Sequence, residues 1–270
     1  MDAWQVTLVV ATLPLFIHDA IRWETAVLVL AIGAGYWFAF ALNDYYDAPF
    51  DVLDSQKKSW NYFVQQSVPE QKLFLVSAAL LLVLAQAYAQ FGWRGWLLWG
   101  ISCFVAWAYS APPIRLKNRP GLDLLTHAIF VQTFPYTVSM CLIRAAWSLL
   151  DWALVAILFL ASLTAQLEQQ ARDFAVDARS GSTFTTKVGK KRIVMGLRLA
   201  TAVCIMIALI FVLNGTMPWY SLPFGFIGLP ALLHRFWRAP EAPRSEKLVI
   251  LSTTVGFLYT GFIFCYFLFY

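Results

Sequence analysis

The sequence predicts an all-α, polytopic membrane protein, a bundle of nine transmembrane helices that forms a single domain over residues 1–270. Three observations support this fold class: 60% of the residues are hydrophobic, only 13% are charged, and the mean hydropathy is +0.64. Soluble domains carry about a quarter charged residues, so the composition excludes an ordinary soluble domain.

Apolar segments recur along the whole chain, and each is close to the length that crosses the hydrocarbon core of a bilayer. We place the nine segments at residues 3–18, 24–43, 72–90, 95–113, 121–143, 151–171, 193–213, 217–233 and 248–270. The first and the eighth are the weakest, because they are short or interrupted by proline.

The basic residues are distributed unevenly between the two sides of this bundle. With the N-terminus in the cytoplasm, the inward connections hold 16 of the 20 basic residues. These are Lys57, Lys58, Lys72, Arg115, Lys117, Arg119, Arg172, Arg179, Lys187, Lys190, Lys191, Arg192, Arg235, Arg238, Arg244 and Lys247. Such an excess is typical of cytoplasmic loops, so we expect a multi-pass protein of the cell membrane with its N-terminus inside.

The net charge of +5 is accounted for by this basic face beside anionic lipid, so the lipid bilayer is an expected partner and nucleic acid is not. The four cysteines lie far apart in apolar segments and lack the spacing of metal ligands. We therefore interpret them as buried hydrophobic residues.

A first acidic motif covers residues 43–51, where the second apolar segment ends. Asn43, Asp47 and Asp51 recur at intervals of four, and Asp44 precedes Asp47 by three. On a continuous helix these side chains would share one face. Pro49 leaves an alternative open, in which the helix ends early and Asp51 lies on the following loop.

A second acidic motif covers residues 172–177, where the sixth apolar segment ends, and places Asp173 and Asp177 four residues apart. A polar run of small residues, 178–190, follows it and offers hydroxyl and backbone donors for phosphate oxygens. Both motifs fall on the expected cytoplasmic side. Carboxylate oxygens are the ligands that Mg²⁺ prefers, and Mg²⁺ commonly shares its shell with substrate phosphates. The two motifs therefore predict a Mg²⁺-dependent site for a diphosphate.

A third polar element, residues 109–120, follows the fourth apolar segment. Pro112 and Pro113 are expected to unwind the helix end, so that the basic side chains of Arg115 and Lys117 lie at the level of the site. Basic groups there could hold a pyrophosphate as it leaves.

These three elements resemble the UbiA superfamily of intramembrane prenyltransferases in order, spacing and topology. The resemblance rests on Asn43-Asp44-x-x-Asp47-x-x-x-Asp51, on Tyr109-Ser110-x-Pro112-Pro113-x-Arg115-Leu116-Lys117, and on Arg172-Asp173-x-x-x-Asp177 with Gly181 and Thr185-Thr186. It implies a UbiA-type bundle that transfers a prenyl group from an allylic isoprenyl diphosphate, such as geranylgeranyl diphosphate, to a lipophilic acceptor within the membrane.

The resemblance also implies roles for individual residues. The expected ligands of Mg²⁺ are Asn43, Asp44, Asp47, Asp51, Asp173 and Asp177. The residues expected to bind the diphosphate or steady it as a leaving group are Asn43, Asp51, Lys57, Arg115, Lys117, Arg172 and Lys187. Tyr109 is expected to support the allylic cation through its aromatic face.

The chain differs from many relatives after the first motif, where it reads Lys57-Lys58-Ser59-Trp60-Asn61-Tyr62-Phe63 in place of an Arg-Pro pair. This form is more similar to archaeal members whose acceptors are lipids or carotenoids. Glu168 and His127 are buried polar candidates, either for contacting the acceptor or for structural hydrogen bonds. The alternative functions are a cation-binding transporter and a lipid-headgroup transferase that does not use a prenyl donor.

Overall fold

The computed structural model describes residues 4–52, 55–180, 184–239, 242 and 244–269, without the side chains of 4–5, 55–57, 173, 175–180 and 268. Its regular secondary structure is entirely helical within these ranges. The chain forms two compact units, the first from residues 1–147 with 176–187 and the second from residues 148–175 with 188–270. Each unit is considered separately below.

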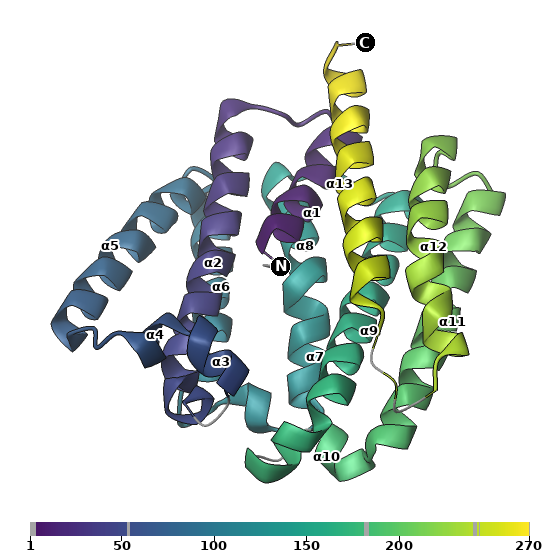
Figure 1. Ribbon diagram of the computed structural model, residues 1–270. Helices are drawn as coiled ribbons and strands as arrows, with labels where there is room; N and C mark the ends of the chain where they lie inside the picture. Colours follow the sequence, from purple (N-terminus) through teal and green to yellow (C-terminus); the bar gives the residue numbers. More distant parts are fainter. Residues whose placement is uncertain (1–3, 53–54, 181–183, 240–241, 243, 270) are drawn as a thin grey trace. The chain divides into compact units, whose positions relative to one another are not determined.

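The first unit begins with a helical hairpin whose two helices differ in length (Figure 1). In chain order its elements are α1 (Trp4–Ile17), α2 (Trp23–Asp51), α3 (Ser55–Trp60), α4 (Tyr62–Gln65), α5 (Glu70–Ala89), α6 (Gly92–Ser110), η1 (Leu116–Asn118), α7 (Leu122–Ala128), η2 (Ile129–Thr133), α8 (Phe134–Ile143) and α10 (Phe184–Val188). The helix α2 packs against α1, α5 and α6, and α1 also packs against α8. Helix α2 is therefore the central element of this unit.

The core of the first unit lies where α1, α2 and α8 meet. Leu15, Leu28 and Val138, one from each helix, are buried there. A Cβ on Gly33 would come within 2.4 Å of Leu8 Cδ2, so a larger residue there would require the Leu8 side chain to move. The Ser139 hydroxyl donates to the Ala11 carbonyl at 2.7 Å, which ties α8 to α1.

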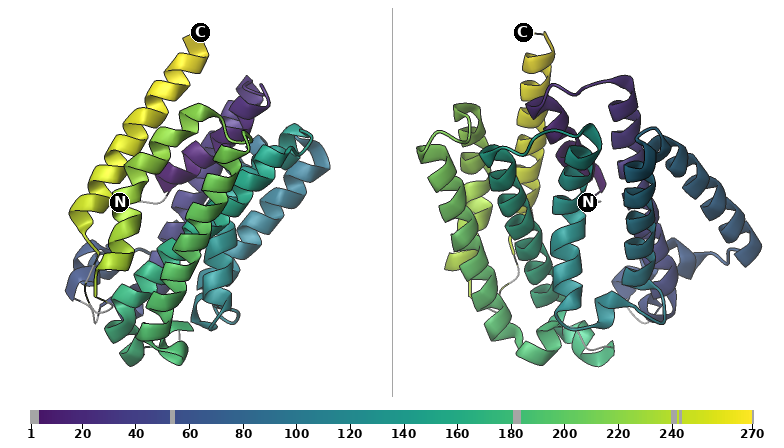
Figure 2. Two further views of the ribbon diagram at one scale, coloured as in Figure 1. Left: turned by 90° about the vertical axis from the view of Figure 1, so that its right-hand side faces the viewer. Right: turned by 180° about the vertical axis from the view of Figure 1, so that it is seen from behind.

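The second unit contains most of α9 (Leu149–Ser180), α11 (Lys190–Leu213), η3 (Trp219–Ser221), α12 (Leu222–Trp237) and α13 (Glu246–Phe269). Helices α12 and α13 run side by side in opposite directions (Figure 2). The Tyr259 hydroxyl donates to the Tyr220 carbonyl at 2.8 Å, and the rings of Tyr259 and Phe224 meet edge to face with centroids 4.8 Å apart. These contacts fix the register of α13 against α12.

The expected all-α fold is confirmed, and each of the nine apolar segments lies mostly in helix over its described residues. Segment 121–143 is continuous but includes the π-helical turn η2 between α7 and α8. By length and composition, five of the described helices could cross a membrane: α2, α5, α9 over Leu149–Arg172, α11 and α13 over Glu246–Phe267. The finer count of nine membrane spans stays a prediction.

Pro49 does not end the second helix. Helix α2 continues through it to Asp51, so the alternative that placed Asp51 on a loop is wrong. The proline removes one backbone donor, but only two further helical residues follow it, and the cost of the lost hydrogen bond is correspondingly small.

Candidate active site

The first acidic motif and the loop after α6 meet at one point in the first unit. Asp47 Oδ1 lies 3.1 Å from Arg115 Nη2 and 2.5 Å from Lys117 Nζ. These two basic residues come from the loop, whereas Asp47 stands in the last turns of α2. The negative end of the α2 dipole and the motif's carboxylates thus meet two cations. This contact joins two of the three polar elements that the sequence singles out.

Asn43, one turn before Asp47, belongs to the same network. Its side-chain oxygen accepts hydrogen bonds from Lys117 Nζ at 2.8 Å and from Ser110 Oγ at 3.0 Å. Its side-chain nitrogen donates to Asp47 Oδ2 at 3.1 Å. The amide and the carboxylate therefore present their oxygens toward the same ammonium group, in the i, i+4 relationship expected from the sequence.

The backbone of the loop explains how its cations reach α2. Helix α6 ends at Ser110, and Arg115 follows in the left-handed conformation with φ of 42°. This turn reverses the chain directly before η1, which carries Lys117. The Arg115 guanidinium also lies over the ring of Phe50, 4.5 Å from its centroid, in a cation–π contact. The expectation that the diproline unwinds this helix end is confirmed.

Two basic groups beside Asp47, the Arg115 guanidinium and the Lys117 ammonium, are both buried at least in part. Within the described part of the chain, Arg115 Nε is buried and has no hydrogen-bond partner, although an unsatisfied buried donor is costly. Burial lowers the pKa of the Lys117 ammonium, and the neighbouring Asp47 carboxylate opposes that shift. Both groups are suited to an additional anionic ligand.

Asn61 connects the chain after α2 back to the end of that helix. Its side-chain nitrogen donates to Asp51 Oδ2 at 2.9 Å and to the Asp44 carbonyl at 2.8 Å. Its side-chain oxygen accepts from the Phe63 N–H at 2.9 Å, which caps α4. Asn61 is only 4% exposed, so a single buried side chain sets the position of both carboxylate-bearing residues.

Asp123, at the start of α7, holds the beginning of α10 in the first unit. Its carboxylate accepts from the Gly121 N–H at 2.7 Å and from the Phe184 N–H at 3.1 Å. Asp123 is 1% exposed, and Thr185 beside Phe184 is fully buried. The polar run after the second acidic motif is therefore anchored by a residue outside all three predicted elements.

The remaining predicted residues are located on helices, and for three of them the structure describes only the backbone. Asp44 is exposed at the end of α2, and Tyr109 occupies the last turn of α6. Arg172 on α9 and Lys187 on α10 are exposed. Asp173 and Asp177 lie within α9 and Lys57 within α3, but their side chains are outside the described part of the structure.

Sequence reasoning assigned no role to Asn61 or Asp123. A signal for Asn61 exists, because asparagine before a short apolar helix is a preferred N-cap. Asp123 has no comparable local signal, because its carboxylate accepts from the N–H of Gly121, two residues earlier, and from that of Phe184, which is distant in the sequence.

Residues 6–261 match the UbiA prenyltransferase family. A lycopene elongase/hydratase from Corynebacterium glutamicum is 26% identical over 210 residues, which cover 75% of this chain and 70% of that protein.

Two solved structures are similar in fold. A UbiA homolog from Archaeoglobus fulgidus, bound to GPP and Mg²⁺, has a TM-score of 0.73 and 18% identity, covering 99% of this chain and 95% of that one. The apo structure of a UbiA homolog from Aeropyrum pernix K1 has a TM-score of 0.74 and 15% identity, covering 98% of this chain and 97% of that one.

Proposed function

Because the chain belongs to the UbiA prenyltransferase family, we propose that it transfers a prenyl group from an allylic isoprenyl diphosphate, such as geranylgeranyl diphosphate, to a lipophilic acceptor within the membrane. The observation that carries this proposal is the cluster in which Arg115 and Lys117 contact the acidic end of α2. Carboxylates for a metal and cations for a diphosphate are the two groups that this chemistry needs side by side.

The donor set at the end of α2 is suited to Mg²⁺. Asn43, Asp47 and Asp51 supply oxygen atoms, the ligand type of a hard divalent ion. Among the described residues no three His, Cys, Asp or Glu side chains form a ready metal site. We propose that Asp44, Asp173 and Asp177 contribute further ligands. Bound Mg²⁺ would neutralise charge on the departing diphosphate.

The chain's own cations would hold the leaving group. The allylic C–O bond breaks and its electron pair departs with the diphosphate, so negative charge develops on the phosphate oxygens. Arg115 has a buried Nε without a partner in the described structure, and the Lys117 ammonium lies beside it. We assign both to those oxygens, with Lys57, Arg172 and Lys187 as further contacts. Tyr109 would face the allylic cation with its ring.

We propose an acyclic carotenoid as the acceptor, because the similar Corynebacterium glutamicum protein is a lycopene elongase/hydratase. Such a polyene carries no hydroxyl nucleophile, so a carbon–carbon double bond would attack the prenyl carbon. The new cation would then lose a proton, or would add water and release one proton from it. We also propose that residues 1–270 act as one domain with nine spans, and that the N-terminus and the active-site loops face the cytoplasm, on the basis of the charge asymmetry.

The test is prenyl transfer by the purified full chain with Mg²⁺ and geranylgeranyl diphosphate. Lycopene, an aromatic quinone precursor and a glycerolipid alcohol would be offered separately, and products identified by mass spectrometry. We expect a product one prenyl unit heavier from lycopene alone. Transfer only to the aromatic ring or to the alcohol would refute the carotenoid assignment. Hydrolysis of a lipid headgroup without transfer from any donor would refute prenyl transfer itself.

A further inference from the structure

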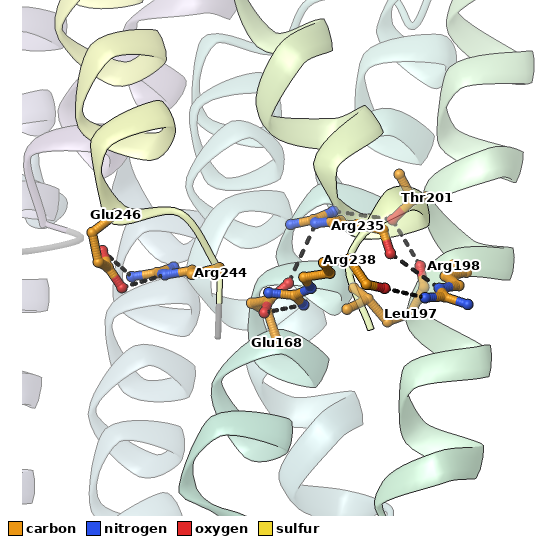
Figure 3. Close-up of polar contacts among 8 residues, drawn as sticks. All are labelled: Glu168, Leu197, Arg198, Thr201, Arg235, Arg238, Arg244 and Glu246. Carbon is orange, nitrogen blue, oxygen red and sulfur yellow. Dashed lines mark hydrogen bonds and ion pairs between the residues drawn. The ribbon is translucent and has the colours of Figure 1, made fainter. Parts of the chain in front are cut away.

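Three carboxylates are buried among the described residues, and their partners differ. Glu168 on α9 pairs with Arg238 at 2.5 Å and with Arg235 at 3.5 Å, both at the end of α12 (Figure 3). Arg198 on α11 donates to the carbonyls of Arg235 at 3.0 Å and Arg238 at 2.7 Å. The charge of Glu168 is therefore balanced by guanidinium groups, and this network joins three helices of the second unit.

The other two buried carboxylates, Asp151 and Asp123, accept from backbone N–H groups. Asp151 Oδ2 accepts from the N–H of Ser148, three residues earlier, at 2.7 Å. Asp123 Oδ1 accepts from the Gly121 N–H at 2.7 Å, and its Oδ2 accepts from the Phe184 N–H at 3.1 Å. Phe184 lies 61 positions further along the chain. Asp123 thus bridges two segments of the first unit that are distant in the sequence.

The bridge uses both oxygens of the Asp123 carboxylate, one for each segment. An ionised carboxylate offers two acceptor oxygens, whereas the amide of asparagine offers one acceptor and one donor group. An asparagine here could therefore accept from one of the two N–H groups, and its own nitrogen would face the other. This bridge thus requires a carboxylate, and an amide of the same shape does not replace it.

One of the two segments is the loop after α6, which carries Arg115 and Lys117. The Asp123 N–H donates to the Arg119 carbonyl at 3.1 Å, and the Arg119 N–H donates to the Leu116 carbonyl at 2.9 Å. The short helix η1, which contains Lys117, also packs against α7, where Asp123 lies in the first turn. The backbone of Asp123 is therefore fixed relative to the two cations of this loop.

The other segment is α10, whose first residue is Phe184. Lys187 follows three residues later, about one helical turn, and is exposed. Thr185 between them is fully buried, which fixes the face that α10 turns toward the rest of the first unit. The hydrogen bond from Phe184 to Asp123 therefore determines where Lys187 stands.

We propose that Asp123 is a positioning residue, which holds Lys187 at the distance from the two loop cations that lets all three bind one diphosphate. This role rests on the proposed function, in which these cations hold the leaving group. Because Asp123 is only 1% exposed, it acts through the two segments and not by contact with the phosphate oxygens.

The test is equilibrium binding of a geranylgeranyl diphosphate analogue, in which sulfur replaces the bridging oxygen, to the purified full chain with Mg²⁺. We expect Asp123→Asn to bind it about tenfold more weakly or worse, the loss expected when a contact with a charged group is removed. Lys187→Gln should weaken binding by a similar factor in the wild type. In the Asp123→Asn background it should have little further effect, because Lys187 is then no longer held at the diphosphate.

Phe184→Pro tests the same hydrogen bond from its donor side. Proline is well tolerated at the first position of a helix, and here it removes the N–H that donates to Asp123. It should weaken binding as Asp123→Asn does, whereas Phe184→Ala keeps the N–H and should bind close to the wild type. If Asp123→Asn does not fold, this pair of variants decides alone, and normal binding by folded Phe184→Pro would contradict the positioning role.

Asp151→Asn is the matched control, because it neutralises an equally buried carboxylate that also accepts from a backbone N–H. It should bind the analogue as the wild type does, and thermal unfolding would show which variants are folded. Additive losses in the double variant, or the same loss in Asp151→Asn, would overturn the proposal. A wild type that does not bind the analogue would instead refute the proposed function.

Discussion

The ammonium of Lys117 lies 2.5 Å from Oδ1 of Asp47, so a cation of the loop after α6 contacts the centre of the first acidic motif. The two residues are 70 positions apart in the sequence. The same ammonium also donates to Asn43 Oδ1 at 2.8 Å, so it contacts two side chains of the first acidic motif. The interaction therefore joins a residue proposed to bind the metal with a residue proposed to hold the leaving group.

Removal of the metal or of Asp47 should abolish prenyl transfer. We expect EDTA, Asp47→Ala and Asp173→Ala each to lower turnover by about two orders of magnitude or more, because charge on the leaving group would no longer be neutralised. Turnover would be measured with labelled geranylgeranyl diphosphate. Glu24→Ala, at the exposed opposite end of α2, is the control and should remain active. Full activity in EDTA would contradict the mechanism.

Arg115→Gln should weaken binding of the allylic diphosphate while the protein still inserts and folds. A hydrogen bond to a charged group contributes about 1.5–3 kcal/mol, so a loss of roughly tenfold to a hundredfold in affinity is expected. Arg115→Lys should be a poor substitute, since an ammonium lacks the planar fork of the guanidinium. Arg119→Gln changes an exposed arginine of the same loop and should bind normally. Wild-type affinity in Arg115→Gln would show that the loop supplies only topology.

Asn61→Ala should raise the Mg²⁺ concentration needed for half-maximal activity. The substitution removes the hydrogen bonds to Asp51 and to the Asp44 carbonyl, so the end of α2 would lose the contact that positions it. Each lost buried bond costs about 1–3 kcal/mol. The measurement is a Mg²⁺ titration of initial rates, with Gln66→Ala as an exposed control in the same connection. An unchanged titration curve would limit Asn61 to capping α4.

Glu168→Gln should destabilise the protein, because it leaves Arg235 and Arg238 without their carboxylate. Breaking a buried ion pair by removing one partner costs about 3–5 kcal/mol. Thermal unfolding in detergent would show the lowered midpoint. Glu246→Gln, which breaks the more exposed pair with Arg244, should change it far less. Equal unfolding midpoints for the two variants would show that the buried pair is no more stabilising than the exposed one.

Both acidic motifs should face the cytoplasm. Cysteines placed at Ser59 and Ser180, after removal of the native cysteines, should react only with reagent that reaches the cytoplasmic side. A cysteine at Thr216, in an outward connection, should react from outside intact cells. The reverse labelling pattern would invert the topology.

Sequence reasoning succeeded where a pattern is local. The i, i+4 spacing of Asn43 and Asp47 fixed their shared face, and the diproline indicated the turn that brings Arg115 back toward α2. The apolar segments likewise predicted the helices, because hydrophobic length is a property of single segments. The charge pattern predicts the orientation of the chain in the membrane, which the cysteine-labelling experiment would test.

The contacts that were not predicted involve backbone groups or residues that are distant in the sequence. Asn61 reaches the end of α2 only because α3 and α4 fold the connection back, and neither short helix was expected. Glu168 remained open between an acceptor contact and a structural bond, and its pairing with two arginines favours the latter. Arg198 donates to backbone carbonyl oxygens, and the sequence does not indicate which backbone carbonyls lie near a given side chain.

The bonds from Arg198 to the end of α12 bear on how the protein is assembled in the bilayer. An arginine within a transmembrane helix costs roughly 2.5–3.5 kcal/mol on insertion when it stands at the helix centre. The last carbonyls of a helix are also left without partners. The Arg198 guanidinium and the carbonyls at the end of α12 satisfy each other's hydrogen bonds. Insertion is therefore more favourable when α11 and α12 leave the translocon together. A nascent chain that stops after α11 would insert less efficiently than one that already includes α12.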